Sequence, residues 1–197
     1  MGPVSIFLLV MPKIQSPTVG PTKEDPKPAA EPKFKFSSVQ CNLPEPLASK
    51  VKQLASKVKD EDINKDEAAD GKPGEIHCTA LYGLTDPKPD KVEELLKGFG
   101  KVKARLGEVG LFETDKADVL KIAVESRDLQ RMNKLLRTLP HENDYPDFKP
   151  HVTLAYLKPG KGKDYLKVGS LQGESVEFAE VEFSSKDGIK HPISLLG

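Results

Sequence analysis

Two octapeptides of the sequence repeat one pattern of residues that can do chemistry. HCTALYGL begins at His77 and HVTLAYLK begins at His151, so each contains His-x-Thr-x-x-Tyr inside a short apolar run. In a β-strand alternate side chains point to the same face, which places His77 beside Thr79 and His151 beside Thr153. An imidazole can move a proton while a hydroxyl donates a hydrogen bond to an oxyanion. We therefore expect the two pairs, facing each other, to hold a phosphate group from both sides.

Coincidence is the alternative, because a histidine in an apolar strand is more often structural than catalytic. The chain has four histidines, and two of them lie in octapeptides that also agree at Thr and Tyr. This repetition favours a functional interpretation of the motifs. Two histidines supply acid and base without a Lewis acid, so we expect no metal and no cofactor. Cys41 and Cys78 have no zinc-ligand spacing, and we expect both to be buried in strands.

Paired His-x-Thr motifs about half a domain apart resemble the 2H (two-histidine) phosphoesterase superfamily. That superfamily includes RNA 2′,3′-cyclic phosphodiesterases (the 2′-5′ RNA ligase group) and phage enzymes that degrade cyclic oligonucleotide signals. The resemblance covers residues 34 to 197, and the segments FSSVQCNLP (from Phe36) and KPHVTL (from Lys149) are most similar to phage or bacterial members. It implies a metal-independent phosphodiesterase in which His151 is the base and His77 the acid. The implied substrate is a cyclic oligonucleotide signal or an RNA 2′,3′-cyclic phosphate end.

Two non-catalytic interpretations remain open. The chain could be a module that binds nucleotide or RNA without turnover, or an accessory domain of a larger (phage) assembly tethered by residues 1–33. Both His-x-Thr pairs are complete, which favours catalysis because a pure binding module needs no pair of proton carriers. The unpaired cysteines indicate a reducing compartment, which predicts a cytoplasmic protein, in the host cytoplasm if the chain is phage-encoded.

Four further residues are candidates for substrate binding. Tyr82 and Tyr156 fall on the strand face opposite the histidines if the strands are regular, so core packing is expected more than base stacking. Lys158 and Lys161 follow the second motif, where they would neutralise a phosphate. A glycine-rich basic turn is, however, more typical of an exposed loop.

The overall charge and the first residues limit the partners that we expect. Lys plus Arg number 30 and Asp plus Glu number 30, so the zero net charge argues against binding to long duplex DNA. A small nucleotide or an RNA end needs only a local pocket, and nothing indicates the oligomeric state. The apolar run at residues 4–11 is shorter than the roughly 20 residues that span a membrane. It also lacks the flanks of a signal peptide. We expect residues 1–33 to be a disordered leader and linker.

The remaining pattern predicts an α+β domain over residues 34–197. Ser126 is an expected N-cap of a helix that runs to Leu139, and a solvated loop is expected at 59–74. In each half of the domain the sequence predicts a strand, then a helix, then a strand that carries a motif. We therefore expect two antiparallel lobes related by a pseudo-two-fold axis, with flanking helices and the active cleft between the lobes. The other expected elements are strands at 35–42, 75–84, 102–112, 119–124, 151–158, 175–183 and 189–196, and helices at 47–58 and 91–99.

Overall fold

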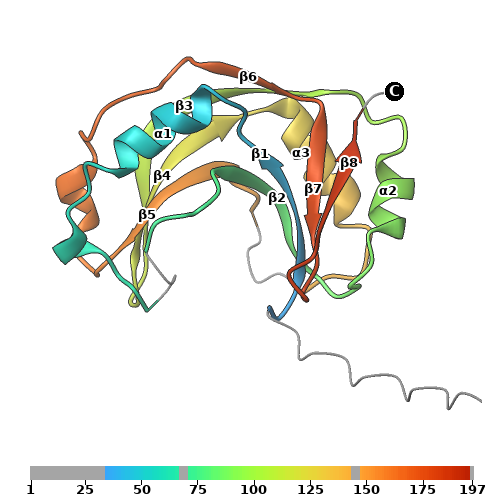
Figure 1. Ribbon diagram of the computed structural model, residues 1–197, viewed down its shortest axis with the longest axis horizontal. Coiled ribbons are helices and arrows are strands. Elements are labelled where there is room, and N and C mark those ends of the chain that lie inside the picture. The colour runs from blue at the N-terminus through green and yellow to red at the C-terminus, as the bar shows by residue number, and fades with distance from the viewer. Residues whose placement is uncertain (1–33, 67–70, 143–146, 196–197) are drawn as a thin grey trace, which may run out of the picture. The chain divides into compact units, whose positions relative to one another are not determined.

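Eight strands form one antiparallel sheet in the computed structural model, which describes residues 34–66, 71–142 and 147–195. Alternation of buried and accessible side chains along most strands fits a sheet with one covered face. The order across the sheet is β6-β3-β4-β5-β2-β1-β7-β8, and Figure 1 shows it curled into an arch. The strands are β1 (Ser37–Asn42), β2 (His77–Leu84), β3 (Val102–Glu113), β4 (Asp118–Glu125), β5 (His151–Leu157), β6 (Ser175–Phe178), β7 (Glu180–Ser184) and β8 (Lys190–Ser194).

The two motif strands, β2 and β5, are neighbours at the centre of this sheet. They pair at one position, where Cys78 lies opposite Val152. On one side of this junction lie β4, β3 and β6, and on the other lie β1, β7 and β8. The predicted α+β class with two antiparallel halves is therefore confirmed. The halves are parts of one continuous sheet.

Helices cover the outer, convex face of the arch (Figure 1). Helix α1 (Leu47–Ala55) packs on β5, and α3 (Arg127–Leu136) packs on β3 and β2. Helix α2 (Asp90–Leu96) lies beside α3. Two short 3-10 helices, η1 (Asp60–Asp62) and η2 (Gly162–Tyr165), complete the described elements.

The spacing of apolar residues and the N-cap residue explain why the segment of α3 forms a helix. Leu129, Met132 and Leu136 recur at helical spacing and are fully buried. The Ser126 hydroxyl accepts a hydrogen bond from the Leu129 amide at 3.0 Å, which confirms the predicted N-cap. The helix ends at Leu136, three residues before the predicted end at Leu139.

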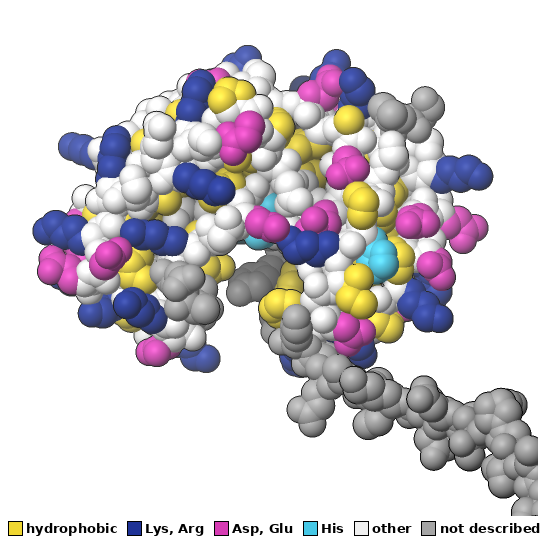
Figure 2. All heavy atoms as spheres, in the orientation of Figure 1, with side chains coloured by type: hydrophobic (Ala, Val, Ile, Leu, Met, Phe, Trp, Pro, Cys, Tyr) yellow, Lys and Arg dark blue, Asp and Glu magenta, His cyan; other side chains and the backbone are white. Residues whose placement is uncertain are grey.

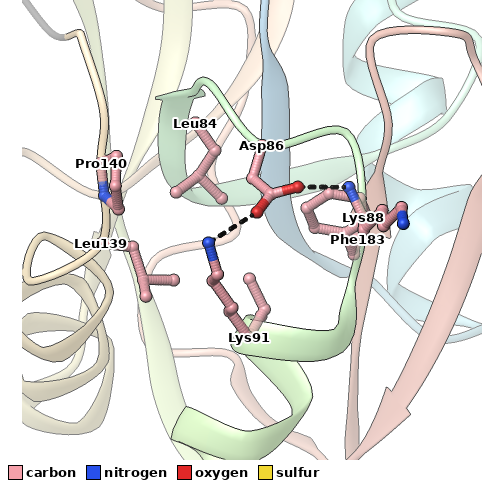
Figure 3. Close-up of a pocket in the computed structure, with 8 residues that line it drawn as sticks. Leu84, Asp86, Lys88, Lys91, Leu139, Pro140 and Phe183 are labelled. Carbon is pink, nitrogen blue, oxygen red and sulfur yellow. Dashed lines mark hydrogen bonds and ion pairs between the residues drawn. The ribbon is translucent and has the colours of Figure 1, made fainter.

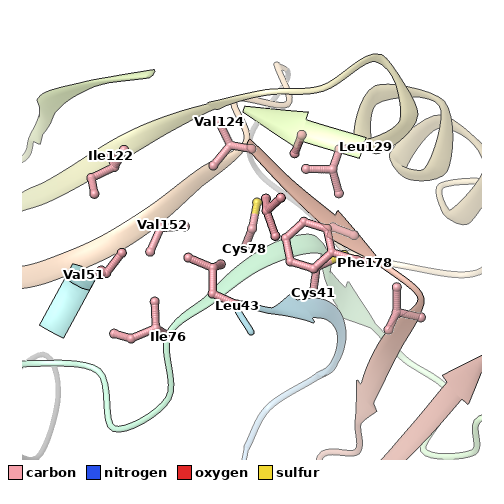
Figure 4. Packing of buried hydrophobic residues seen from close by; sticks show 14 of the residues in the cluster. Cys41, Leu43, Val51, Ile76, Cys78, Ile122, Val124, Leu129, Val152 and Phe178 are labelled. Atoms are coloured by element: carbon pink, nitrogen blue, oxygen red, sulfur yellow. The ribbon is translucent and has the colours of Figure 1, made fainter. Parts of the chain in front are cut away.

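The core fills the space between the outer face of the sheet and the helices (Figure 4). Val51 of α1 and Leu129 of α3 reach this layer, and so do the residues of β1, β2, β4 and β5 whose side chains point toward the helices. Cys41 and Cys78 are buried in it, as predicted. Burial raises the pKa of the Cys78 thiol to about 12 and that of Cys41 further. Both thiols are therefore packing groups at neutral pH.

The C-terminal region differs from the prediction in its connections. The predicted strand 175–183 is two strands, β6 and β7, separated by Ala179. Strand β6 pairs with β3 at one end of the sheet, whereas β7 pairs with β1 in the other half. A period-two pattern records the alternation of faces along a strand but not the neighbour with which the strand pairs, so it misses this crossing.

The charged segment after α1 is less solvated than predicted. Asp62 is buried and accepts a hydrogen bond of 2.6 Å from the Tyr165 hydroxyl, and Ile63 forms a β-bridge with Leu157. The predicted leader, residues 1–33, lies outside the described residues. No helix in the ranges described here is long and apolar enough to cross a membrane.

Candidate active site

The four motif side chains lie together on the concave face of the sheet. Each His and Thr flanks a buried residue, Cys78 in β2 and Val152 in β5, and these two residues point into the core opposite each other. Antiparallel register therefore places each motif histidine opposite the threonine of the other motif. Cβ atoms of directly opposed residues are about 5 Å apart and those of diagonal neighbours about 7–8 Å. The two imidazoles thus occupy one diagonal of a small square and the two hydroxyls the other.

The square is partly accessible and opens on a hollow. All four motif side chains are partly buried rather than fully covered. Figure 2 shows histidine colour at the top of the hollow beneath the arch, with acidic and basic side chains beside it. A group of phosphate size can therefore reach both imidazoles from solvent.

A backbone carbonyl fixes the tautomer of each motif histidine. The Nδ1 atom of His77 lies 3.1 Å from the Glu75 carbonyl oxygen, and that of His151 lies 2.8 Å from the Lys149 carbonyl oxygen. A carbonyl can only accept, so Nδ1 carries the hydrogen and the neutral ring keeps its lone pair on Nε2. His141 makes the same contact at 2.8 Å outside the square. The contact sets the ring orientation but does not by itself mark a catalytic histidine.

Acidic groups surround the first-motif histidine. Lys190 bridges Glu75 and Glu182, and Glu182 also accepts hydrogen bonds from Gln40 at 3.0 Å and Asn42 at 3.3 Å. Burial lowers the pKa of this histidine from its usual 6.5, while the two carboxylates act in the opposite direction. Its neighbourhood therefore contains two negative charges and one positive charge.

Basic and aromatic groups surround the second-motif histidine. The His151 and Phe112 rings are nearly perpendicular with centroids 5.0 Å apart, and Lys121 Nζ lies 4.4 Å from the Phe112 ring centre. Lys121 stands opposite Thr153 in the neighbouring strand. Burial lowers the pKa of His151, and the charges of Lys121 and of the other motif imidazole lower it further. The strand register thus places the His77 imidazole close enough to disfavour protonation of His151.

Tyr82 lies on the same face as the motif residues, which corrects the prediction that it packs in the core. From Thr79 to Tyr82 strand β2 advances three residues while β1 advances two, so Ala80 forms a β-bulge. The extra residue reverses the alternation of faces. Tyr82 is 48% exposed, and its ring is nearly perpendicular to the Phe36 ring, with the two centroids 5.7 Å apart.

The second motif contains the same irregularity at the same place. From Thr153 to Tyr156 strand β5 advances three residues while β4 advances two, so Leu154 is the extra residue. Tyr156 is partly accessible and opposes Val119, which shares a face with the lysine opposite Thr153. The prediction that Tyr156 faces the core is also wrong. The two bulges place His, Thr and Tyr of each motif on one surface.

A buried side chain of α3 holds the first bulge. Asn133 is 5% exposed, and its amide donates a hydrogen bond of 2.7 Å to the carbonyl of the bulged Ala80. A bulge leaves the extra residue unpaired in the ladder, so this carbonyl needs another partner. Sequence reasoning missed Asn133. Its position four residues after Leu129, within the apolar stripe of the helix, is the signal that marks it as buried.

Lys158 and Lys161 are not part of this surface. The Lys158 ammonium donates to the Glu61 carbonyl at 2.7 Å, and Lys161 Nζ lies 3.6 Å from an Asp62 carboxylate oxygen. Lys158 is five residues beyond Thr153, roughly 16 Å along an extended strand. The sequence pattern missed the lysine that does lie beside the motifs, Lys121, although its place in an alternating strand indicates its face.

The small pocket at the far end of β2 is separate from the motifs. In the parts of the chain described above, no three His, Cys, Asp or Glu side chains gather as metal ligands. A small pocket lies at the far end of β2, where Asp86 accepts hydrogen bonds from the Lys91 ammonium at 3.0 Å and the Lys88 amide at 3.1 Å (Figure 3). It has room for about one water molecule. The open concave face is therefore the site to consider.

Comparison with solved structures identifies the fold. E. coli LigT complexed with 3′-AMP has a TM-score of 0.53 and 16% identity, over 84% of this chain and 96% of that chain. Apo LigT has a TM-score of 0.51 at the same identity and coverage. Kluyveromyces marxianus Usb1 with uridine monophosphate has a TM-score of 0.50 and 10% identity, over 83% of this chain and 99% of that chain. The similarity shows a shared fold.

Comparison at the level of sequence identifies the family. No curated protein matches the chain. The family model described as anti-CBASS protein Acb1 matches residues 42–185, which include both motifs and most of the sheet. Together with the shared fold, this match confirms the 2H phosphoesterase resemblance seen in the sequence. The chain belongs to the anti-CBASS protein Acb1 family.

Proposed function

We propose that this protein is a metal-independent phosphodiesterase that cleaves a phosphodiester of a nucleotide. The observation that carries the proposal is the diagonal arrangement of two complete His-Thr pairs on one accessible face. In-line cleavage needs one group to deprotonate the nucleophile and another to protonate the leaving oxygen, on opposite sides of phosphorus. Two histidines on a diagonal meet this need, and neither role requires a metal ion.

The electrostatic surroundings support His151 as the base and His77 as the acid. Burial and the charge of Lys121 favour the neutral form of His151, whose Nε2 takes the proton of the attacking water or hydroxyl as its oxygen bonds to phosphorus. Nearby carboxylates favour the protonated form of His77, which gives its proton to the leaving oxygen as the second P–O bond breaks. The hydroxyls of Thr79 and Thr153 donate hydrogen bonds to the non-bridging oxygens, where negative charge accumulates.

Family membership favours a cyclic oligonucleotide signal as the substrate, with an RNA 2′,3′-cyclic phosphate end as the alternative. Structures of similar fold hold small nucleotides, 3′-AMP in LigT and uridine monophosphate in Usb1. A small nucleotide suits this site too, since an exposed ring, Tyr82, is available for base stacking on the same face as the catalytic groups.

Product analysis with a substrate panel tests the proposal. Purified protein is incubated with cyclic di- and trinucleotides and with RNA ends, with and without excess chelator, and the products are separated by chromatography. We expect His77→Ala and His151→Ala each to lower turnover about a hundred-fold or more, the usual scale for a positioned acid or base. The double variant should be little worse than the worse single variant, because the two residues act as a unit.

His141→Ala is the matched control, because His141 makes the same ring-to-carbonyl contact away from the square. It should leave turnover unchanged, and so should the chelator. If both motif variants cleave every substrate as fast as the wild type, the histidines are structural. The protein would then be a nucleotide-binding module.

A further inference from the structure

We infer that Lys121 forms a second phosphate subsite beside the catalytic square, so that the substrate carries another phosphate next to the scissile one. The inference rests on the proposed function for the position of the scissile phosphate. It adds a residue and a chemical requirement: a nucleotide with at least two phosphate groups, such as a cyclic dinucleotide, rather than one with a single phosphate.

The position of Lys121 places its charge outside the square. Lys121 opposes Thr153 on one side and Gly110 on the other, so it lies in the strand next to the second motif. A Cβ atom on Gly110 would lie 3.5 Å from Nζ, and Phe112 of the same strand lies under the ammonium. The side chain therefore leans away from the motif strands, toward β3. Its charge is one to two strand spacings from the square, about 5 to 10 Å, which is the reach of one nucleotide.

The charge of Lys121 has no counter-ion in the described part of the chain. Among the residues that the structure describes, no carboxylate lies within ion-pair distance of it. Burial lowers the pKa of Lys121, and Lys149 lowers it further by repulsion. A partly desolvated cation without a counter-ion is unfavourable, and the Phe112 ring offsets only part of that cost. An anionic ligand group would supply the missing partner.

The two halves of the concave face differ in a way that sets the direction of the ligand. Near His77, Lys190 is already paired with Glu75 and Glu182. Around His151 the cations, Lys121 and Lys149, repel each other. A second phosphate is therefore favoured on the His151 side and opposed on the His77 side.

Binding of two product-like nucleotides tests the inference without relying on turnover. Calorimetry would compare adenosine 3′-monophosphate with adenosine 3′,5′-bisphosphate, for the wild type, Lys121→Met and Lys121→Arg. Met keeps the contact with Phe112 and removes the charge. Lys97→Met, at the exposed residue that follows α2, controls for the loss of one positive charge. We expect Lys121→Met to lower the affinity for the bisphosphate about ten-fold or more, as for a lost charge-assisted hydrogen bond.

The affinity of Lys121→Met for the monophosphate should stay within about three-fold of the wild type, a change well below that of one charged hydrogen bond. Arg should restore most of the bisphosphate affinity, and Lys97→Met should change neither. An equal loss for both nucleotides would overturn the inference, because Lys121 would then act on the scissile-phosphate site or on the fold. Unchanged binding of both nucleotides would overturn it as well.

Turnover separates this inference from the proposed function. The same variants are assayed on a cyclic dinucleotide and on a nucleoside 2′,3′-cyclic monophosphate. If the wild type cleaves neither substrate but the bisphosphate difference persists, the proposed activity fails and the subsite stands. If the wild type cleaves both and Lys121→Met slows both equally, the activity stands and the subsite fails.

Discussion

Replacing Asn133 with Leu should destabilise the protein through the first bulge. Leu has the same branching and the same number of side-chain heavy atoms as Asn, so the change removes the amide that donates to the Ala80 carbonyl at 2.7 Å without opening a cavity. Both groups are buried, so water cannot take over the hydrogen bond. A carbonyl left unsatisfied in this way costs about 1 to 3 kcal/mol. For a chain of this size that corresponds to a fall in Tm of roughly 2 to 12 °C.

The substitution should also affect the site, because the bulge sets the face on which Tyr82 lies. If the unpaired carbonyl drives the strand toward regular pairing, Tyr82 is displaced from the surface of the motifs. We therefore expect the affinity for adenosine 3′-monophosphate to fall along with stability. Thermal and guanidinium unfolding give the first quantity, and calorimetry gives the second.

Gln130→Leu on the same helix is the control. Gln130 donates to the Phe148 carbonyl at 3.3 Å from an exposed position, so its loss should stay within about 0.5 kcal/mol. The reasoning is refuted if Asn133→Leu is as stable as the wild type within the same margin. In that case the hydrogen bond would not be what maintains the bulge.

Two further predictions concern Tyr82 and the motif histidines. Tyr82→Ala should lower nucleotide affinity but change the free energy of unfolding by less than about 1 kcal/mol, because the side chain is exposed. Truncation of an aromatic side chain in the core would cost about 3 to 5 kcal/mol. A loss of that larger size in guanidinium unfolding would contradict the exposed position of Tyr82. The pKa values of His77 and His151 are lowered by folding, so below pH 6.5 the unfolded chain binds more protons than the folded chain. The free energy of unfolding therefore decreases as the pH is lowered. Between pH 7.5 and 5 a His77→Gln, His151→Gln double variant should therefore lose less stability than the wild type, and equal losses would argue against the pKa shifts.

Much of the fold could be predicted because each element carries its own periodic signal. The stripe Leu129, Met132 and Leu136 and the cap at Ser126 define α3 from local residues alone. The His-x-Thr pairs could be placed on one face because alternation is reliable over two residues. These inferences need only the nearest neighbours along the chain.

The parts that could not be predicted depend on partners distant in sequence. A bulge exists only relative to the strand opposite, so strict alternation put Tyr82 and Tyr156 on the wrong face. The recurrence of Tyr at the same position in both motifs was a signal of a shared surface, but the alternation rule overrode it. Lys121 lies beside the site because it pairs with Thr153 across two strands, and this pairing cannot be seen in a local sequence pattern.

The crossing at Ala179 has a consequence for any attempt to divide this protein. Each half of the sheet receives strands from the last part of the chain, β6 on one side and β7 with β8 on the other. A fragment that stops after β5 would leave β3 and β1 as unpaired edges, open to aggregation. Neither histidine can therefore be isolated on a self-sufficient piece. Loss of the C-terminal strands should dismantle both sides of the site in one cooperative event.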